Sequence, residues 1–303
     1  MLLFTSMSWY LSLLVLVVIE CLTLVASAQN EDFSDAQLAV LKQKFQELKP
    51  RTGTISLGAD VGILQLPAGF QYLDGKDAKT MLVDFWGNPP ESADGVLGMI
   101  VESPERAISE TGVGIVITYT EDGHVDDKDA QAIDYAELLK NMQAATDVES
   151  KERIKQGFSA ARLVGWAEAP SYDISTHKLF WAKELQFNGE PDNTLNYCTR
   201  ILGRRGVLEL NAVSTVGHLD EVRRQMQLIL ASVDFTAGNR YADFNAATDK
   251  LAAYGIAALV AGGVAAKMGV FKAILVALLA AKKLVVVAII ALGAAIAKIF
   301  KKK

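Results

Sequence analysis

The sequence has few of the side chains that most often carry out chemistry: its 303 residues include only 2 cysteines and 3 histidines. It contains no Gly-x-Ser-x-Gly and no His-Glu-x-x-His motif, so the usual signatures of serine hydrolases and zinc proteases are excluded. Cys21 lies in a predicted signal peptide, which leaves Cys198 as the only cysteine of the mature chain. A single cysteine forms no internal disulfide, so the stability of the fold must come from its hydrophobic core.

Acidic residues are absent from residues 251–303, where the only charges are eight lysines. The run from Leu251 to Phe300 is otherwise almost wholly apolar and offers no polar face wide enough to meet water. We therefore expect residues 251–303 to be a membrane anchor in contact with lipid, with one crossing near residues 251–266. A two-pass hairpin is the alternative, because residues 274–297 are apolar apart from one lysine pair.

The N-terminus, residues 1–28, is predicted to be a signal peptide. Its apolar core, Leu11–Ile19, is followed by the small residues Ala26-Ser27-Ala28. No Lys or Arg precedes the core and Glu20 interrupts it, so an uncleaved N-terminal anchor is the alternative. We expect residues 29–250 to form a domain outside the cytoplasm, at the bacterial inner membrane and in the periplasm.

Charge is distributed unevenly along the chain, although the net charge is only −5. Eight of the 30 Lys and Arg follow residue 250, whereas 34 of the 35 Asp and Glu lie within residues 29–250, which gives that segment a net charge of −12. An acidic domain argues against nucleic acid as a partner, because phosphate binding needs clustered Lys and Arg. The basic tail fits the cytoplasmic face of a membrane.

The periodicity of residues 29–250 predicts one α+β domain. Helices are expected over 32–49, 76–86, from about 133 to 142 and over 219–230; strands are expected as a hairpin within 54–74 and over 96–101, 113–120, 162–168, 178–187, 195–202, 207–213 and 232–235. The four strands from residue 162 onward have short connections and predict an antiparallel meander. The layout predicts an antiparallel sheet with helices packed on one face.

The densest cluster of possible ligands is the turn at residues 121–129. Its candidates for a hard cation such as Ca²⁺ are the carboxylates Glu121, Asp122, Asp126, Asp127 and Asp129, with His124 among them. The spacing lacks the EF-hand pattern. It fits better a solvated turn in which Asp126 or Asp127 caps the following helix. No metal site and no cofactor is therefore predicted.

Other groups have simpler explanations than catalysis. His177 precedes a predicted strand and His218 a predicted helix, where histidine is usually a surface residue. Cys198 lies in a predicted strand, where a lone cysteine is more often buried and inert. Gly203–Gly206 joins two strands, so a hairpin is expected instead of a phosphate loop.

Small residues recur at every fourth position of the tail. The candidates for close packing of membrane helices are Ala253, Ala257, Ala261, Ala265 and Gly269. Such a ridge allows transmembrane helices to approach and self-associate. The alternative is simply the high Ala and Gly content of the tail, and a four-residue spacing drifts around a helix.

Several motifs together resemble a known family. They are Trp86-Gly-Asn-Pro-Pro90, the segment Tyr119–Asp127, Ile133-Asp-Tyr135, Leu163-Val-Gly-Trp-Ala167, His177–Lys183, Leu202-Gly-Arg-Arg-Gly206 and Ala252–Ala257. The chain resembles a family of uncharacterised bacterial proteins described as predicted membrane-anchored, a domain of unknown function. The resemblance implies a secreted domain with a C-terminal membrane segment and implies no activity. The strand–helix–strand Val207–Phe235 is also similar in layout to the PsbP/Mog1-like α+β fold.

These observations favour a non-enzymatic binding or assembly module of the cell envelope, tethered to the membrane and partnered by itself or by an envelope protein. One alternative is a membrane-anchored hydrolase that uses carboxylates of the 121–129 turn. Another is a regulatory cap on a helical membrane assembly. An exposed pair of carboxylates would favour the enzyme, and an apolar surface patch would favour binding.

Overall fold

The computed structural model describes residues 35–59, 61–109 and 112–261. The predicted signal peptide and residues 262–303 of the predicted anchor lie outside these ranges. The chain divides into two units, one ending at Ile256 and one starting at Ala257. Of the second unit the structure describes residues 257–261, which belong to helix α7 (Ile256–Ala261). Among the described residues no helix is long and apolar enough to cross a membrane.

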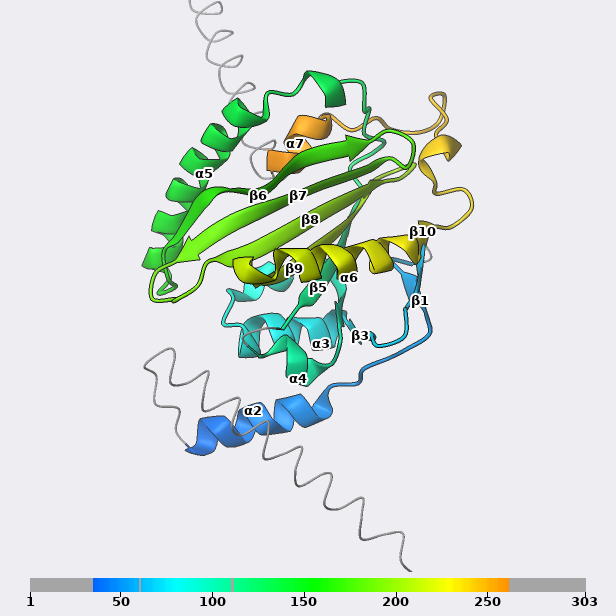
Figure 1. Ribbon diagram of the computed structural model, residues 1–303. Helices are drawn as coiled ribbons and strands as arrows, with labels where there is room; N and C mark the ends of the chain where they lie inside the picture. Colours follow the sequence, from blue (N-terminus) through cyan, green and yellow to red (C-terminus); the bar gives the residue numbers. More distant parts are fainter. Residues whose placement is uncertain (1–34, 60, 110–111, 262–303) are drawn as a thin grey trace, which may run out of the picture. The chain divides into compact units, whose positions relative to one another are not determined.

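A mixed α+β architecture with antiparallel sheets is confirmed (Figure 1). In spatial order, the larger sheet of the described residues consists of β3 (Gln71–Asp74), β4 (Val96–Val101), β5 (Gly114–Thr120), β9 (Val207–Thr215), β8 (Thr194–Leu202), β7 (Lys178–Phe187) and β6 (Ala161–Asp173). All neighbouring pairs are antiparallel. Strands β6 to β9 are consecutive in sequence, so the predicted meander is correct.

A second, smaller sheet was not predicted. It consists of β1 (Thr54–Leu57), β2 (Gly62–Gln65) and β10 (Val233–Phe235), with β2 in the centre. The hairpin β1–β2 is a local pairing that the sequence indicates, but β10 joins it from far along the chain and pairs Asp234 with Ile63. The reason is burial, because Leu64, Val233 and Phe235 lie in the core.

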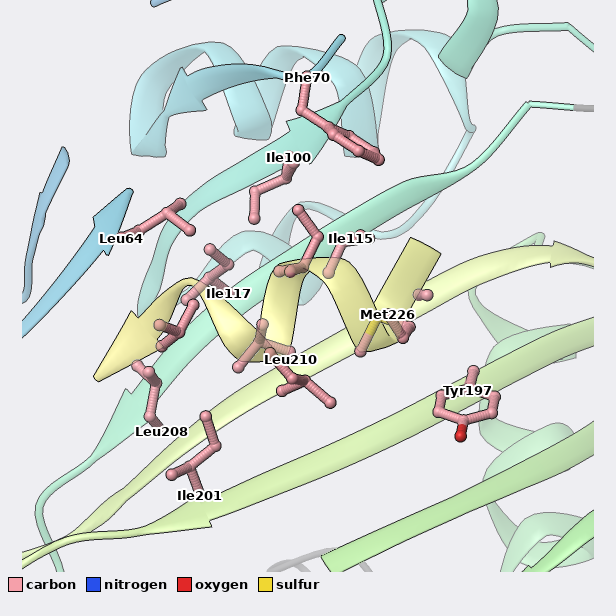
Figure 2. Close-up of a cluster of buried hydrophobic side chains, with 14 of the residues drawn as sticks. Leu64, Phe70, Ile100, Ile115, Ile117, Tyr197, Ile201, Leu208, Leu210 and Met226 are labelled. Atoms are coloured by element: carbon pink, nitrogen blue, oxygen red, sulfur yellow. The ribbon is translucent and has the colours of Figure 1, made fainter. Parts of the chain in front are cut away.

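Helix α6 (Leu219–Ala231) covers one face of the larger sheet. Its buried side chains include Val222, Met226 and Ile229, which recur at helical spacing. They pack in one cluster with buried residues of β5, β8 and β9 (Figure 2), among them Ile117 and Leu210. Each side chain of this size contributes about 1.5–3 kcal/mol when it is buried.

A second cluster lies at the N-terminal end of the fold. Phe45 of α2 (Asp35–Glu47) packs edge-on against Phe85 at 5.7 Å between ring centroids, next to the buried Met81 and Met99. The helix expected over 76–86 is in fact α3 (Gly75–Thr80), capped by the side chain of Asp74, followed by a π-helical turn over Met81–Phe85.

Helix α5 (Tyr135–Lys155) packs along the outer strand β6. Its N-terminal cap is Asp134, whose carboxylate accepts hydrogen bonds from the backbone N–H groups of Ala136 and Glu137. The prediction that Asp126 or Asp127 caps this helix is wrong. A short 3₁₀ turn at Ala130–Ala132 separates those residues from the helix, so they are free to contact other parts of the fold.

Candidate functional site

The acidic turn, defined as residues 121–129, does not gather its carboxylates around one point. Asp126 contacts Lys128 at 2.7 Å, and this hydrogen bond lowers the pKa of Asp126. The carboxylates of Asp122 and Asp129 point to different partners near the end of the domain. Among the described residues no group of three or more possible ligands could hold a metal ion. We therefore assign no metal site to this turn.

The partners of the turn belong largely to one segment, which we call the strap and define as residues 236–256. The backbone N–H of His124 donates to the Lys250 carbonyl at 2.8 Å, and the Ala252 N–H donates to the His124 carbonyl at 2.8 Å. These bonds form a parallel bridge between His124 and Leu251. The strap is thus joined to the turn by backbone as well as by side chains.

Gly123 allows the backbone of the strap to come this close to the acidic turn. Its φ of +117° disfavours any residue with a side chain, and a Cβ atom there would come within 2.7 Å of the Lys250 carbonyl oxygen. The motif Glu-Asp-Gly-His therefore has a structural purpose, which is to bring the backbone of the strap against the turn.

Four rings stack where the strap crosses the turn. The ring centroids of Phe244 and His124 are 4.0 Å apart, those of His124 and Tyr241 are 4.2 Å apart, and those of Tyr241 and His177 are 3.9 Å apart. Each ring face has room for one neighbour at such a distance, so the order is Phe244, His124, Tyr241, His177. Two of the three histidines of the chain are in this stack.

His177 ends the stack in the β6–β7 hairpin, with an uncommon positive φ of 51°. Its Nδ1 lies 3.3 Å from the Asp127 carboxylate and 3.2 Å from the Tyr172 hydroxyl. Tyr172 donates to the same carboxylate at 2.7 Å. Burial, followed by the charge and hydrogen bond of Asp127, raises the pKa of Tyr172 above its usual value. Asp127 therefore ties the hairpin to the acidic turn.

His124 is the most enclosed member of the stack, with only 6% of the residue exposed. Its Nδ1 is buried without a hydrogen-bond partner among the described residues. Burial lowers the pKa of His124 below the usual value for histidine; the backbone carbonyls of Gly203 and Arg204 and the charges of Asp126 and Asp127 act in the opposite direction. The neutral imidazole is the form that this environment favours.

The strap has further attachments to the β8–β9 turn. Arg204 donates two hydrogen bonds to Asp249, at 2.7 and 3.0 Å, and lowers the pKa of that carboxyl. Arg205 donates to the side-chain oxygen of Asn239 at 2.9 Å. At its end, the strap is held by the Tyr254 hydroxyl on Asp122 at 3.1 Å and by the Ile256 N–H on Asp129 at 3.1 Å.

The other residues considered from the sequence have ordinary positions. Cys198 is buried in β8, as expected. His218 lies at the start of α6, where its Nδ1 is 2.6 Å from the Thr215 hydroxyl. Gly203 and Gly206 join β8 to β9 in a hairpin, as expected. His177, expected at the surface, is instead half-buried in the ring stack.

The small-residue ridge of the tail falls only partly within the described residues. Ala257 and Ala261 lie in α7, whereas Ala253 precedes that helix and is exposed in the strap. Its place in the strap follows from the hydrogen bonds of its neighbours, Ala252 and Tyr254. Ala265 and Gly269 lie outside the described residues.

Sequence reasoning missed Tyr241, Phe244 and Asp249, which give the strap its contacts. The available signal was the presence of aromatic residues just before an apolar tail, because an unstructured linker contains few of them. The described residues of the acidic turn fasten the strap to the fold, because Asp122, His124 and Asp129 all contact residues of the strap.

A surface groove lies beside the smaller sheet. Ile63 and Gln65 of β2, residues 231–237 and Arg240 line it. The groove holds one ion pair, between Arg240 and Asp234 at 3.6 Å.

Comparison with known proteins gives a family and no activity. No curated protein matches the chain. The solution structure of cyanobacterial PsbP (CyanoP) from Synechocystis sp. PCC 6803 is similar, with 11% sequence identity, coverage of 62% of this chain and 92% of that one, and a TM-score of 0.34. The sequence model of a family described as "Protein of unknown function (DUF2167)" matches residues 49–293. The resemblance to an uncharacterised family is thereby confirmed, and the chain belongs to this family, DUF2167.

Proposed function

We propose that the chain is a non-enzymatic module tethered to a membrane, which presents its α+β domain outside the cytoplasm to a protein partner or to a second copy of itself. The observation that carries this proposal is the strap, because it fastens the domain directly to the start of the apolar tail. Three of its last residues, Ala252, Tyr254 and Ile256, each form a hydrogen bond to the acidic turn. A strap fixed in this way leaves no free linker between the described domain and Ala257.

The contacts of the strap also limit where a membrane segment could begin. Since Leu251–Ile256 contribute to the domain, the apolar run that is left starts at Ala257. The stretch 257–266 would rise only about 15 Å as a helix, against a hydrocarbon core of about 30 Å. The crossing expected over residues 251–266 is therefore too short once the strap is bound. We propose that the crossing continues past Lys267, whose long side chain can reach the interface.

The hydrolase alternative receives less support. It requires two carboxylates that face a substrate together, as in acid–base catalysis. Asp122, Asp127 and Asp129 instead contact Tyr254, Tyr172 and the Ile256 N–H respectively, and Asp126 pairs with Lys128. Their oxygens are engaged by the protein itself, which suits a structural joint.

Fractionation of cells tests the tether. The full chain and a matched chain ending at Ile256, both with the same N-terminus, would be expressed and washed with alkaline carbonate. We expect the full chain to stay with the membranes and the shorter chain to be released. Release of the full chain by carbonate would contradict the tether.

The size of the particle tests the binding role. The full chain would be extracted in a mild detergent and its mass measured by light scattering with the detergent subtracted. We expect a complex larger than one copy of the 303-residue chain, either with itself or with a bound protein. A single copy at all accessible concentrations would contradict a binding or assembly module.

A further inference from the structure

His124 contacts the strap through both its backbone and its ring. Its backbone forms both bonds of the bridge to Lys250 and Ala252, and its ring lies between those of Tyr241 and Phe244. A change in the state of this ring therefore acts on the strap directly.

The groups that face the ring come from three elements. The acidic turn supplies the carboxylates of Asp126 and Asp127, and the β8–β9 turn supplies the backbone carbonyls of Gly203 and Arg204. The strap supplies two uncharged rings, while the guanidinium of Arg204 is held by Asp249. His177 lies beyond Tyr241, at the far side of that ring.

A second proton on the imidazole would be poorly accommodated here. Nδ1 is buried with no acceptor among the described residues, and burying a charge without a partner is costly. The two carboxylates and the ring faces reduce this cost, yet burial has the larger effect and the pKa of His124 remains below its usual value. Once exposed to water, the same ring would titrate near pH 6.5.

The strap also buries few of its residues. Within the strap only its last residue, Ile256, is buried, whereas β8 and β9 carry a continuous core. Segments with little buried apolar surface open locally at lower free energy than the core unfolds.

We propose that the strap is a pH-dependent catch, which detaches from the acidic turn on acidification while the sheet stays folded. His124 binds the proton when the strap is released and does not when the strap is docked, so the equilibrium constant for release rises as the pH falls below about 6.5. One linked proton gives a rise of up to about tenfold per pH unit. This regulation rests on the contact between His124 and the strap and not on the location of the chain, so failure of the membrane proposal would leave it standing.

Hydrogen exchange on the full chain in detergent tests the catch. Peptides from the strap and the acidic turn would be compared with peptides from residues 194–215 between pH 7.5 and 5.0, after correction for the intrinsic exchange rate. We expect protection of the strap and turn to fall by up to about tenfold per pH unit, with β8 and β9 unchanged. Equal protection of the strap at both pH values, or simultaneous loss in β8 and β9, would overturn the proposal.

Variants assign the proton to its residue. His124→Phe keeps an aromatic ring in the stack and should abolish the pH dependence, whereas His177→Gln and His218→Gln should retain it. If the dependence persists in His124→Phe, or disappears in His177→Gln, the assignment is wrong. Should His124→Phe not fold, Asp249→Asn provides a second test. It weakens the docked strap through Arg204, so the midpoint of release should move to higher pH, and an unchanged midpoint would count against the catch.

Discussion

Arg204 and Asp249 lie 45 positions apart and form a two-point contact, in which Nε and Nη2 of the arginine donate to the two carboxylate oxygens at 2.7 and 3.0 Å. The contact joins the β8–β9 turn to the strap. Its geometry requires the planar fork of a guanidinium, which a lysine ammonium cannot reproduce.

We therefore predict that Arg204→Lys loosens the strap although the charge is kept. Trypsin cleavage after Lys250 should become severalfold faster, because the strap spends more time detached. The control is Arg205→Lys, since Arg205 makes one bond to Asn239 and its loss should have a smaller effect. Equal cleavage rates in the two variants would argue against a special role for the Arg204 fork.

A second prediction concerns the backbone of the acidic turn. Gly123→Ala and Gly189→Ala both place a side chain at positive φ, which costs about 1–2 kcal/mol. At position 123 the new Cβ would also lie 2.7 Å from the backbone carbonyl oxygen of Lys250. At position 189 no atom lies within 4 Å of the new Cβ. We expect denaturant melts to show a greater loss for Gly123→Ala, together with faster exchange in the strap. The idea fails if the two variants are alike in both measurements.

Much of the sheet could be predicted because its pairings are local. β6 to β9 follow one another with short turns, and β9 alternates buried and half-buried residues along most of its length. The joining of β10 to β2 could not be predicted in the same way, since a three-residue strand has too little pattern to indicate a partner.

The contacts of the strap were even harder to predict from the sequence. Tyr241 and Phe244 are isolated aromatic residues in a segment without periodicity, so their stacking on His124 left no trace in the spacing of residues. The boundary expected at residue 250 came from the change in composition there, whereas the structural division falls between Ile256 and Ala257. Apolar residues such as Leu251 can belong to a domain edge as readily as to a tail.

A third prediction concerns the core. Met226→Ala should destabilise the fold by about 2–5 kcal/mol, because Met226 is fully buried between α6 and the larger sheet. The neighbouring Gln227 is exposed on the same helix, so Gln227→Ala should change stability by no more than about 0.5 kcal/mol. Chemical unfolding of the full chain measures both. A small effect at Met226 would mean that α6 does not pack as described.

A fourth prediction is that Ca²⁺ has little effect on the domain. The carboxylates of the acidic turn diverge toward separate partners, so there is no common point at which a cation would be held. Millimolar Ca²⁺ should move the melting temperature by less than about 1 °C, because a ligand that binds only weakly stabilises little. A rise of several degrees that disappears in the double variant Asp126→Asn, Asp127→Asn would show that the turn binds calcium.

The last prediction concerns alkaline pH and Tyr72. This residue is 4% exposed, and its hydroxyl donates to the Leu97 carbonyl at 2.6 Å. Burial, with a smaller contribution from the charge of Asp74, raises the pKa of Tyr72 to about 12. The folded state therefore holds the phenolic proton more tightly than the unfolded state, whose tyrosines titrate near pH 10. The stabilisation is complete below pH 10 and is lost as the pH rises toward 12, an effect on the order of 2 kcal/mol.

Urea melts at pH 8 and at pH 11.5 measure this loss in the natural chain and in Tyr72→Phe. Burial also raises the pKa values of Tyr172 and Tyr241, so both chains should lose stability at high pH. The phenylalanine variant lacks the Tyr72 contribution and should lose less, although it starts lower at pH 8 because the Leu97 carbonyl has lost its donor. If the two chains lost the same stability between these pH values, the Tyr72 hydroxyl would have to be open to water. That result would conflict with the close packing of this hydroxyl against Gly98, where an added Cβ would come within 2.3 Å of the phenol oxygen.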